Sequence, residues 1–231
     1  MKIEDALDRL NRALPLKANQ NKCTKQVRAL HQKILLSFIT RGRILTKNEM
    51  ATYVDELDDA VNVLRKNDMV VFSENDDPIG AYPFTMEERE NKISVNGYQV
   101  NAMCALDALA VSPMFEVKVR IDSRCRITDT PLHIEQSGMI IENLDDVGEI
   151  CFGIDWGTVE SGTCCADSLC LDMLFLKDHE ISQQWLANNP EEREIFTLPQ
   201  AVEFASRFFV PLMEKDNLPK CQSPLNISPE N

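Results

Sequence analysis

Cys104 and Asp107, in the segment Met-Cys-Ala-Leu-Asp, have the residue types and the spacing for chemistry at a soft electrophile. A helix is predicted to begin near Met103, after a strand that ends near Val100, and residues three apart share one helix face. The positive end of the helix dipole is expected to lower the pKa of the Cys104 thiol, and Asp107 can accept or donate a proton. A buried cysteine beside a solvent-facing aspartate is the alternative reading.

A second group of thiols lies in Thr-Cys-Cys-Ala-Asp-Ser-Leu-Cys, which contains Cys164, Cys165 and Cys170. Adjacent cysteines rarely form a disulfide with each other, because that linkage strains the backbone. A zinc site usually needs paired Cys-x-x-Cys or Cys/His spacing, and the sequence has no second pair of this kind. Soft thiolates suit soft metals, so this segment favours soft-metal chemistry over a structural zinc site.

The elements that must position these thiols begin with a helical lobe over residues 1–88. Helical spacing predicts helices at 3–14 and 24–41, a short one from Thr46 to about Tyr53 opened by a Thr-x-x-Glu capping box, and another over 57–64. Strands are expected at 69–72 and 79–84. The last three of these helices and the hairpin predict a winged-helix-like unit.

Nucleic-acid binding by this lobe is disfavoured by its charge. The helix in the recognition position begins Asp-Glu-Leu-Asp-Asp at residues 55–59, and the expected wing carries Glu74, Asp76 and Asp77. Phosphate contacts need clustered Lys and Arg, so these acidic groups would repel DNA. We therefore expect a helical lobe packed on a catalytic domain.

Residues 89–213 are expected to form that catalytic α+β domain, and residues 214–231 a flexible tail. Phe115, Val117, Val119 and Ile121 alternate with polar residues, as in a half-buried strand. Further strands are expected at 132–134, 149–154 and 170–176, and helices at 181–188 and 198–213. The fold class is therefore α+β, with a mixed or antiparallel β core flanked by helices.

The net charge, the apolar runs and the cysteine content of the 231 residues limit which partners and which cellular location can be expected. The net charge is −13 and the pI is about 4.7, which disfavours both nucleic acid and anionic membrane surfaces. No apolar run approaches the roughly 20 residues that cross a bilayer, and the N-terminus is acidic where a secretory sequence would be apolar. A cytoplasmic location is expected, where the eight cysteines would stay reduced and serve metal binding or catalysis.

The segment Cys-Ala-Leu-Asp after a short strand resembles the catalytic segment of the organomercurial (alkylmercury) lyases. The similarity continues through Val-Lys-Val at 117–119, Asp-Ser-Arg-Cys at 122–125 and Thr-Asp-Thr-Pro-Leu at 128–132. When the order of helical lobe and β core is included, the resemblance covers roughly residues 25–213. Asn101 and Met103 depart from the pattern, because the resemblance would place aromatic residues before the catalytic cysteine.

The resemblance implies a site of two cysteines and one aspartate. Cys104 and Asp107 carry over directly, whereas Cys164, Cys165 and Cys170 compete for the second thiol. The family cysteine leads into an apolar strand, a polar turn and a helix bearing Trp, and residues 170–185 follow this order. We therefore assign Cys170, with Cys164 and Cys165 as accessory mercury ligands. Cys125 resembles a structural cysteine of the family.

The resemblance also implies the reaction. Two thiolates would bind the mercury of R–Hg⁺, Asp107 would protonate the carbon, and a hydrocarbon and mercuric ion would form. No cofactor is expected, because mercury is substrate and product. The expected partners are the organomercurial, small cellular thiols that remove mercury, and a mercuric reductase. A non-enzymatic thiol protein that binds or senses soft metals is the alternative.

Overall fold

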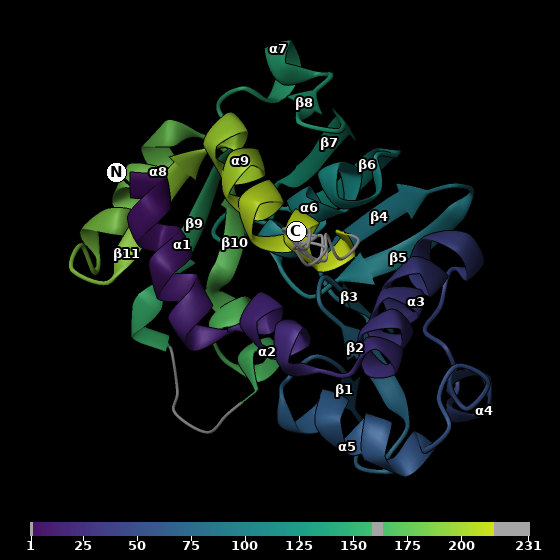
Figure 1. Cartoon of the computed structure of the whole chain (residues 1–231). Helices are drawn as coiled ribbons and strands as arrows, with labels where there is room; N and C mark the ends of the chain where they lie inside the picture. The colour runs from purple at the N-terminus through teal and green to yellow at the C-terminus, as the bar shows by residue number, and fades with distance from the viewer. Residues whose placement is uncertain (1, 159–163, 215–231) are drawn as a thin grey trace, which may run out of the picture.

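The computed structural model describes residues 2–158 and 164–214 (Figure 1). The α-helices are α1 (Lys2–Ala13), α2 (Leu16–Lys22), α3 (Lys25–Arg41), α4 (Lys47–Met50), α5 (Leu57–Lys66), α6 (Ala105–Phe115), α7 (Leu144–Val147), α8 (His179–Ala187) and α9 (Leu198–Phe209). The 3₁₀ turns are η1 (Trp156–Thr158), η2 (Cys165–Asp167), η3 (Leu169–Asp172) and η4 (Val210–Met213). The strands are β1 (Val71–Phe72), β2 (Pro78–Ala81), β3 (Phe84–Thr85), β4 (Asn91–Val95), β5 (Tyr98–Ala102), β6 (Lys118–Arg124), β7 (Pro131–Ser137), β8 (Ile140–Ile141), β9 (Cys151–Asp155), β10 (Met173–Leu176) and β11 (Arg193–Thr197).

Two antiparallel sheets and the helices around them form the α+β fold. The larger sheet has eight strands in the order β1-β2-β3-β5-β4-β6-β7-β8, and the smaller has three in the order β10-β9-β11. Helix α6 contacts strands of both sheets and packs against α9, which in turn contacts α1 (Figure 1). Ten of the eleven residues of α6 are Ala, Leu, Val, Ser, Pro, Met or Phe, which suits a helix enclosed on all sides.

Local signals explain the predicted helices of the N-terminal lobe. The Thr24 hydroxyl accepts a hydrogen bond from Val27 N at the start of α3, and Gly42 ends that helix with φ 68°. The capping box of Thr46 and Glu49 is present at α4. Helix α2 was not predicted, because its sequence is polar. It is held by tertiary contacts, with the buried Gln20 amide donating to Leu212 O over 2.9 Å.

Two predicted strands begin three residues later than expected. The apolar alternation from Phe115 is strand only from Lys118, because Phe115 completes α6 and Glu116 ends that helix in the left-handed conformation. The apolar run from Cys170 is strand only from Met173, since residues 169–172 form a 3₁₀ turn. This turn, rather than a strand, carries Cys170.

Strands β1 and β2 pair as the hairpin expected for the lobe, and they belong to the same sheet as β4 to β8. The sheet therefore runs across the predicted boundary between residues 88 and 89, and the division of the chain into 1–88 and 89–213 stays a prediction. The tail expected from 214 onwards, with Cys221, lies outside the described residues except for Glu214.

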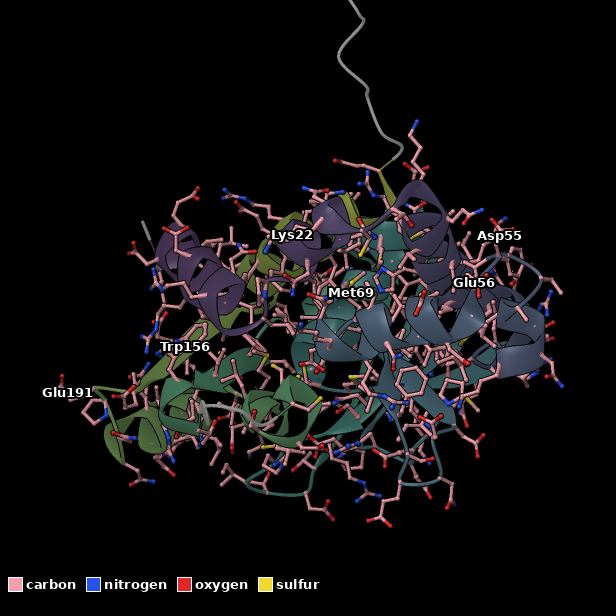
Figure 2. The ribbon with its side chains drawn as sticks, turned by 60° about the horizontal axis from the view of Figure 1, so that its bottom comes forward. Lys22, Asp55, Glu56, Met69, Trp156 and Glu191 are labelled. Carbon is pink, nitrogen blue, oxygen red and sulfur yellow. The ribbon has the colours of Figure 1, made fainter. Side chains whose placement is uncertain are left out.

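The acidic residues just before and at the start of α5, which argued against nucleic-acid binding, are exposed. Figure 2 shows Asp55 and Glu56 at the periphery of the molecule, immediately before α5. Asp58 and Asp59 follow in the first turn of that helix. Among the described helices, none combines the length and the apolar character that a bilayer crossing requires.

Candidate active site

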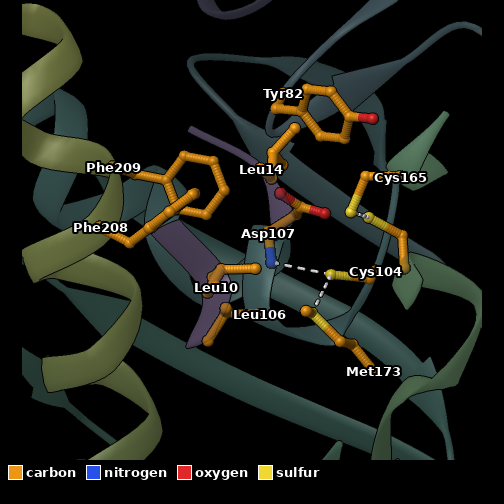
Figure 3. A pocket seen from close by; sticks show the side chains of 11 residues that line it. Leu10, Leu14, Tyr82, Cys104, Leu106, Asp107, Cys165, Met173, Phe208 and Phe209 are labelled. Carbon is orange, nitrogen blue, oxygen red and sulfur yellow. Dashed lines mark hydrogen bonds between the residues drawn. The ribbon is translucent and has the colours of Figure 1, made fainter. Parts of the chain in front are cut away.

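The start of α6 positions the first thiol and the carboxyl group. Cys104 has an extended backbone and is the N-cap residue of the helix, and its Sγ accepts a hydrogen bond from Asp107 N over 3.4 Å. A cysteine thus takes the capping position that Ser, Thr or Asp usually occupies. Because Asp107 is the third residue of the helix, its side chain lies on the same side as the Cys104 sulfur (Figure 3).

Cys170 joins this pair from the turn before β10. Its Sγ, the Cys104 Sγ and a carboxylate oxygen of Asp107 all lie within 4.8 Å of one another. The three residues are between 1% and 3% exposed. Asp107 Oδ2 is buried without a hydrogen-bond partner, which is costly unless a ligand or a proton satisfies it. The structure therefore brings together the three residues that the sequence singled out.

The three groups open into a pocket of about 200 Å³, a volume that includes space open to solvent. Its walls come from α1, α6, β10 and α9, and most are apolar (Figure 3). The apolar wall residues are Leu10, Leu14, Leu106, Met173, Phe208 and Phe209. Met173 Sδ lies 3.6 Å from Cys104 Sγ. Such a pocket suits an apolar group attached to a soft, thiophilic atom.

Burial changes the protonation of the pair. It raises the pKa of Asp107 to about 7, so that this carboxyl group can hold a proton near neutral pH. Burial also raises the pKa of Cys104, to about 12. The expectation that the helix dipole lowers the pKa of Cys104 was therefore wrong, because the loss of hydration outweighs the dipole. The resting site holds thiols, and a metal must displace their protons.

The neighbouring thiols lie at different depths. Cys165 is 6% exposed, and its Sγ is 3.6 Å from Cys170 Sγ. The pKa of Cys170 is raised by its hydrogen bonds with Cys104 and Cys165 and by burial. Cys164 is half-buried and faces a different group, the carboxylate of Asp68. Of the two accessory candidates, Cys165 touches the central group and Cys164 does not.

Asp68 and Tyr82 were missed by the sequence reasoning. Cys164 Sγ donates to Asp68 Oδ1 over 2.9 Å, and Tyr82 Oη donates to Asp68 Oδ2 over 3.0 Å. The backbone N–H groups of Cys165 and Ala166 donate to Asp68 and to Tyr82, respectively. Residues 68 and 82 are far from 164 in the chain, so no local pattern could reveal this cluster. It holds the turn that carries the two accessory cysteines.

Cys125 is 1% exposed and is not among the residues that line the pocket. Its backbone N–H donates to Thr130 O and its carbonyl accepts from Asp129 N, which closes the turn between β6 and β7. This position agrees with a structural use of the residue.

The pKa of Asp107 leads to a prediction for stability. The unfolded carboxyl group loses its proton near pH 3.8, whereas the folded group keeps it until about pH 7. Between these values the folded state binds the extra proton, so this group makes stability fall as the pH rises. Asp107→Asn lacks this titrating group, so its stability should not fall in the same way. The difference between the two free energies of unfolding, variant minus wild type, should therefore increase by on the order of 4 kcal/mol from pH 4 to 7 and then level off.

Urea unfolding of both proteins at several pH values measures this difference. Asp129→Asn is the control, because Asp129 is exposed and has φ 56°, a conformation that asparagine also tolerates. A difference for Asp107→Asn that stays flat over this pH range would contradict the raised pKa.

A protein-family model identifies the family of the chain. The family model described as MerB, alkylmercury lyase, matches residues 84–210, more than half of the chain. No curated protein sequence matches the chain. The solved structure "Crystal structure of the mercury-bound form of MerB2" superposes with a TM-score of 0.70 at 21% identity, over 86% of this chain and 98% of that chain, and supports the fold. With residues 84–210 spanning β3 to α9 and including all three site residues, the chain belongs to the alkylmercury lyase family.

Proposed function

We propose that the chain cleaves the carbon–mercury bond of organomercurials by protonolysis at Cys104, Asp107 and Cys170. The observation that carries the proposal is the convergence of two thiols and one carboxyl group within 4.8 Å at the base of a mostly apolar pocket. Membership of the lyase family supplies the reaction class. The apolar walls would receive the organic group, and the sulfurs would bind the metal.

The first steps transfer protons from sulfur to oxygen. Cys104 binds the mercury of R–Hg⁺ as a thiolate, and its proton goes to Asp107, whose pKa of about 7 lets it keep that proton. Cys170 then adds as the second sulfur ligand and gives its proton to solvent or to a small thiolate. Two thiolates increase the electron density on mercury and on the carbon bonded to it.

The last step moves the proton from Asp107 to carbon. The C–Hg bond breaks as the C–H bond forms, the hydrocarbon leaves, and mercuric ion remains on Cys104 and Cys170 with the Asp107 carboxylate beside it. Asp107 lies one helical turn from Cys104, which supports the proposal that it protonates a carbon on a metal bound at this sulfur. Small thiols and a mercuric reductase would then take the ion. No cofactor takes part in these steps.

The experiment that tests this proposal supplies phenylmercury with an excess of a small thiol. Benzene should form in proportion to the phenylmercury consumed, because Asp107 protonates the released carbon. Gas chromatography of the headspace measures it, and methylmercury should give methane in the same way. Boiled protein with the same thiol is the control. Mercury binding without any hydrocarbon would overturn the proposal and favour a soft-metal binding or sensing protein.

The helical lobe is proposed to support the pocket in a winged-helix-like arrangement, without binding nucleic acid. Leu10 and Leu14 line the pocket, and Asp68 and Tyr82 hold the Cys164–Cys165 turn. The exposed acidic residues at the start of α5 agree with this supporting role.

A further inference from the structure

The proposed reaction leaves mercuric ion on two sulfurs that are almost completely buried. Cys104 is 2% exposed and Cys170 is 3% exposed. A small external thiol would have to enter the apolar pocket to reach either of them. In the described ranges, the cysteine outside the proposed reaction site whose sulfur contacts Cys170 is Cys165, at 3.6 Å.

A second thiol–carboxyl pair lies beside this contact, toward the surface. Cys164 is the residue before Cys165 in the chain, it is half-buried, and its Sγ donates to Asp68 Oδ1 over 2.9 Å. Cys165 lines the inner pocket with Cys104 and Cys170. Cys164 and Asp68 instead line two outer hollows, one with Arg65 and Phe72 and the other with Asn19 and Lys66. The two adjacent cysteines thus connect the buried pocket with the surface.

We propose that Cys165 and Cys164 form an exit route that carries mercuric ion from the buried pair to external thiols. The inference rests on the proposed function only for the source of the ion. Cys165 lies close enough to Cys170 to share a two-coordinate metal with it. Cys164 follows one residue further out, about 3.8 Å away between Cα atoms.

Each transfer exchanges one sulfur ligand for another without a change of oxidation state. First, the Hg–S bond to Cys104 breaks, the bond to Cys165 forms, and the Cys165 proton passes to Cys104. Next, Cys164 replaces Cys170 on the metal. The Cys164 proton goes to the carboxylate of Asp68, which already accepts its hydrogen bond, and Cys170 takes a proton from solvent. Two external thiols, or the two sulfurs of a dithiol, then displace both protein sulfurs at the surface. One of their protons returns to Cys165, the other goes to solvent, and Asp68 gives its proton back to Cys164.

The test uses mercuric chloride alone, so that it does not depend on hydrocarbon formation. The full chain is loaded with one equivalent and mixed with excess dithiothreitol, and the decay of the ultraviolet mercury–thiolate absorption gives the release rate. Cys165→Ser and Cys164→Ser should each release mercury about tenfold more slowly, because the dithiol must then reach the buried pair directly. Cys23→Ser is the matched control, since Cys23 is half-buried and contacts Asn19 and Met69 instead.

Release from either variant at the wild-type rate would overturn the exit route. Circular dichroism melting checks the fold of each variant, and Cys165→Ala replaces Cys165→Ser if the serine variant does not fold. A slowed release in both variants, together with a wild type that forms no hydrocarbon, would sink the proposed function and leave the exit route standing. Normal hydrocarbon formation by the wild type, together with unchanged mercury release from both variants, would support the proposed function and reject the exit route.

Discussion

Asp107→Asn is expected to bind an organomercurial and to release hydrocarbon about a hundredfold to ten-thousandfold more slowly than the wild type, the range for loss of a positioned proton donor. The amide keeps the size of the carboxyl group but cannot take the thiol proton or give it to carbon. The two sulfurs stay in place, so that metal binding should persist. The variant therefore separates binding from bond cleavage.

Single-turnover measurements test this expectation directly. Enzyme in excess over phenylmercury is quenched at intervals and the benzene is quantified, while equilibrium dialysis measures the bound mercury. The exposed Asp129→Asn should match the wild type in both measurements. Benzene formation by Asp107→Asn at the wild-type rate would remove Asp107 from the reaction and leave its burial without a functional explanation.

The start of α6 could be predicted from sequence because its signals are local. A strand followed by Cys-Ala-Leu-Asp-Ala-Leu places Cys104 and Asp107 on one helix face, whatever the rest of the chain does. The buried state of Asp107 could not be predicted in this way. It depends on α1 and α9, whose residues Leu10, Phe208 and Phe209 complete the pocket from opposite ends of the chain.

The protonation of Cys104 shows why local reasoning gave the wrong sign. The helix dipole acts within one turn and is visible in the sequence pattern, whereas desolvation depends on every element packed around the sulfur. Cys104 is 2% exposed, and its pKa rises to about 12. The proton that the dipole was expected to remove is instead still present, so the proposed reaction has a thiol proton to transfer to Asp107.

The distinct positions of the cysteines were only partly predictable. The order of strand, turn and Trp-bearing helix after Cys170 pointed to that residue, and the structure places its sulfur beside Cys104. The 3₁₀ turn at 165–167 separates the two adjacent cysteines. It directs Cys165 toward Cys170 and Cys164 toward Asp68. Asp68 and Tyr82 hold this turn from the N-terminal lobe, and no spacing within 164–170 indicates them.

Cys170→Ser is expected to slow hydrocarbon release on the order of a hundredfold or more, which is the effect of removing one group that stabilises developing charge. Only Cys104 would then bind mercury as a thiolate, and the carbon would gain less electron density before protonation. Cys164→Ser should still cleave the first equivalent of phenylmercury, because its sulfur faces Asp68 and is not part of the group within 4.8 Å. Its defect should be confined to the release of mercuric ion.

The comparison of these two variants decides which thiol is the second ligand. First-turnover benzene is measured for both, with Cys151→Ser as a matched control, since Cys151 is buried in β9 and is not among the residues lining the pocket. Full activity in Cys170→Ser combined with an inactive Cys164→Ser would assign the second ligand to Cys164. That result would require the turn at 164–170 to rearrange when mercury binds, because the sulfur of Cys164 would have to leave Asp68 to reach Cys104.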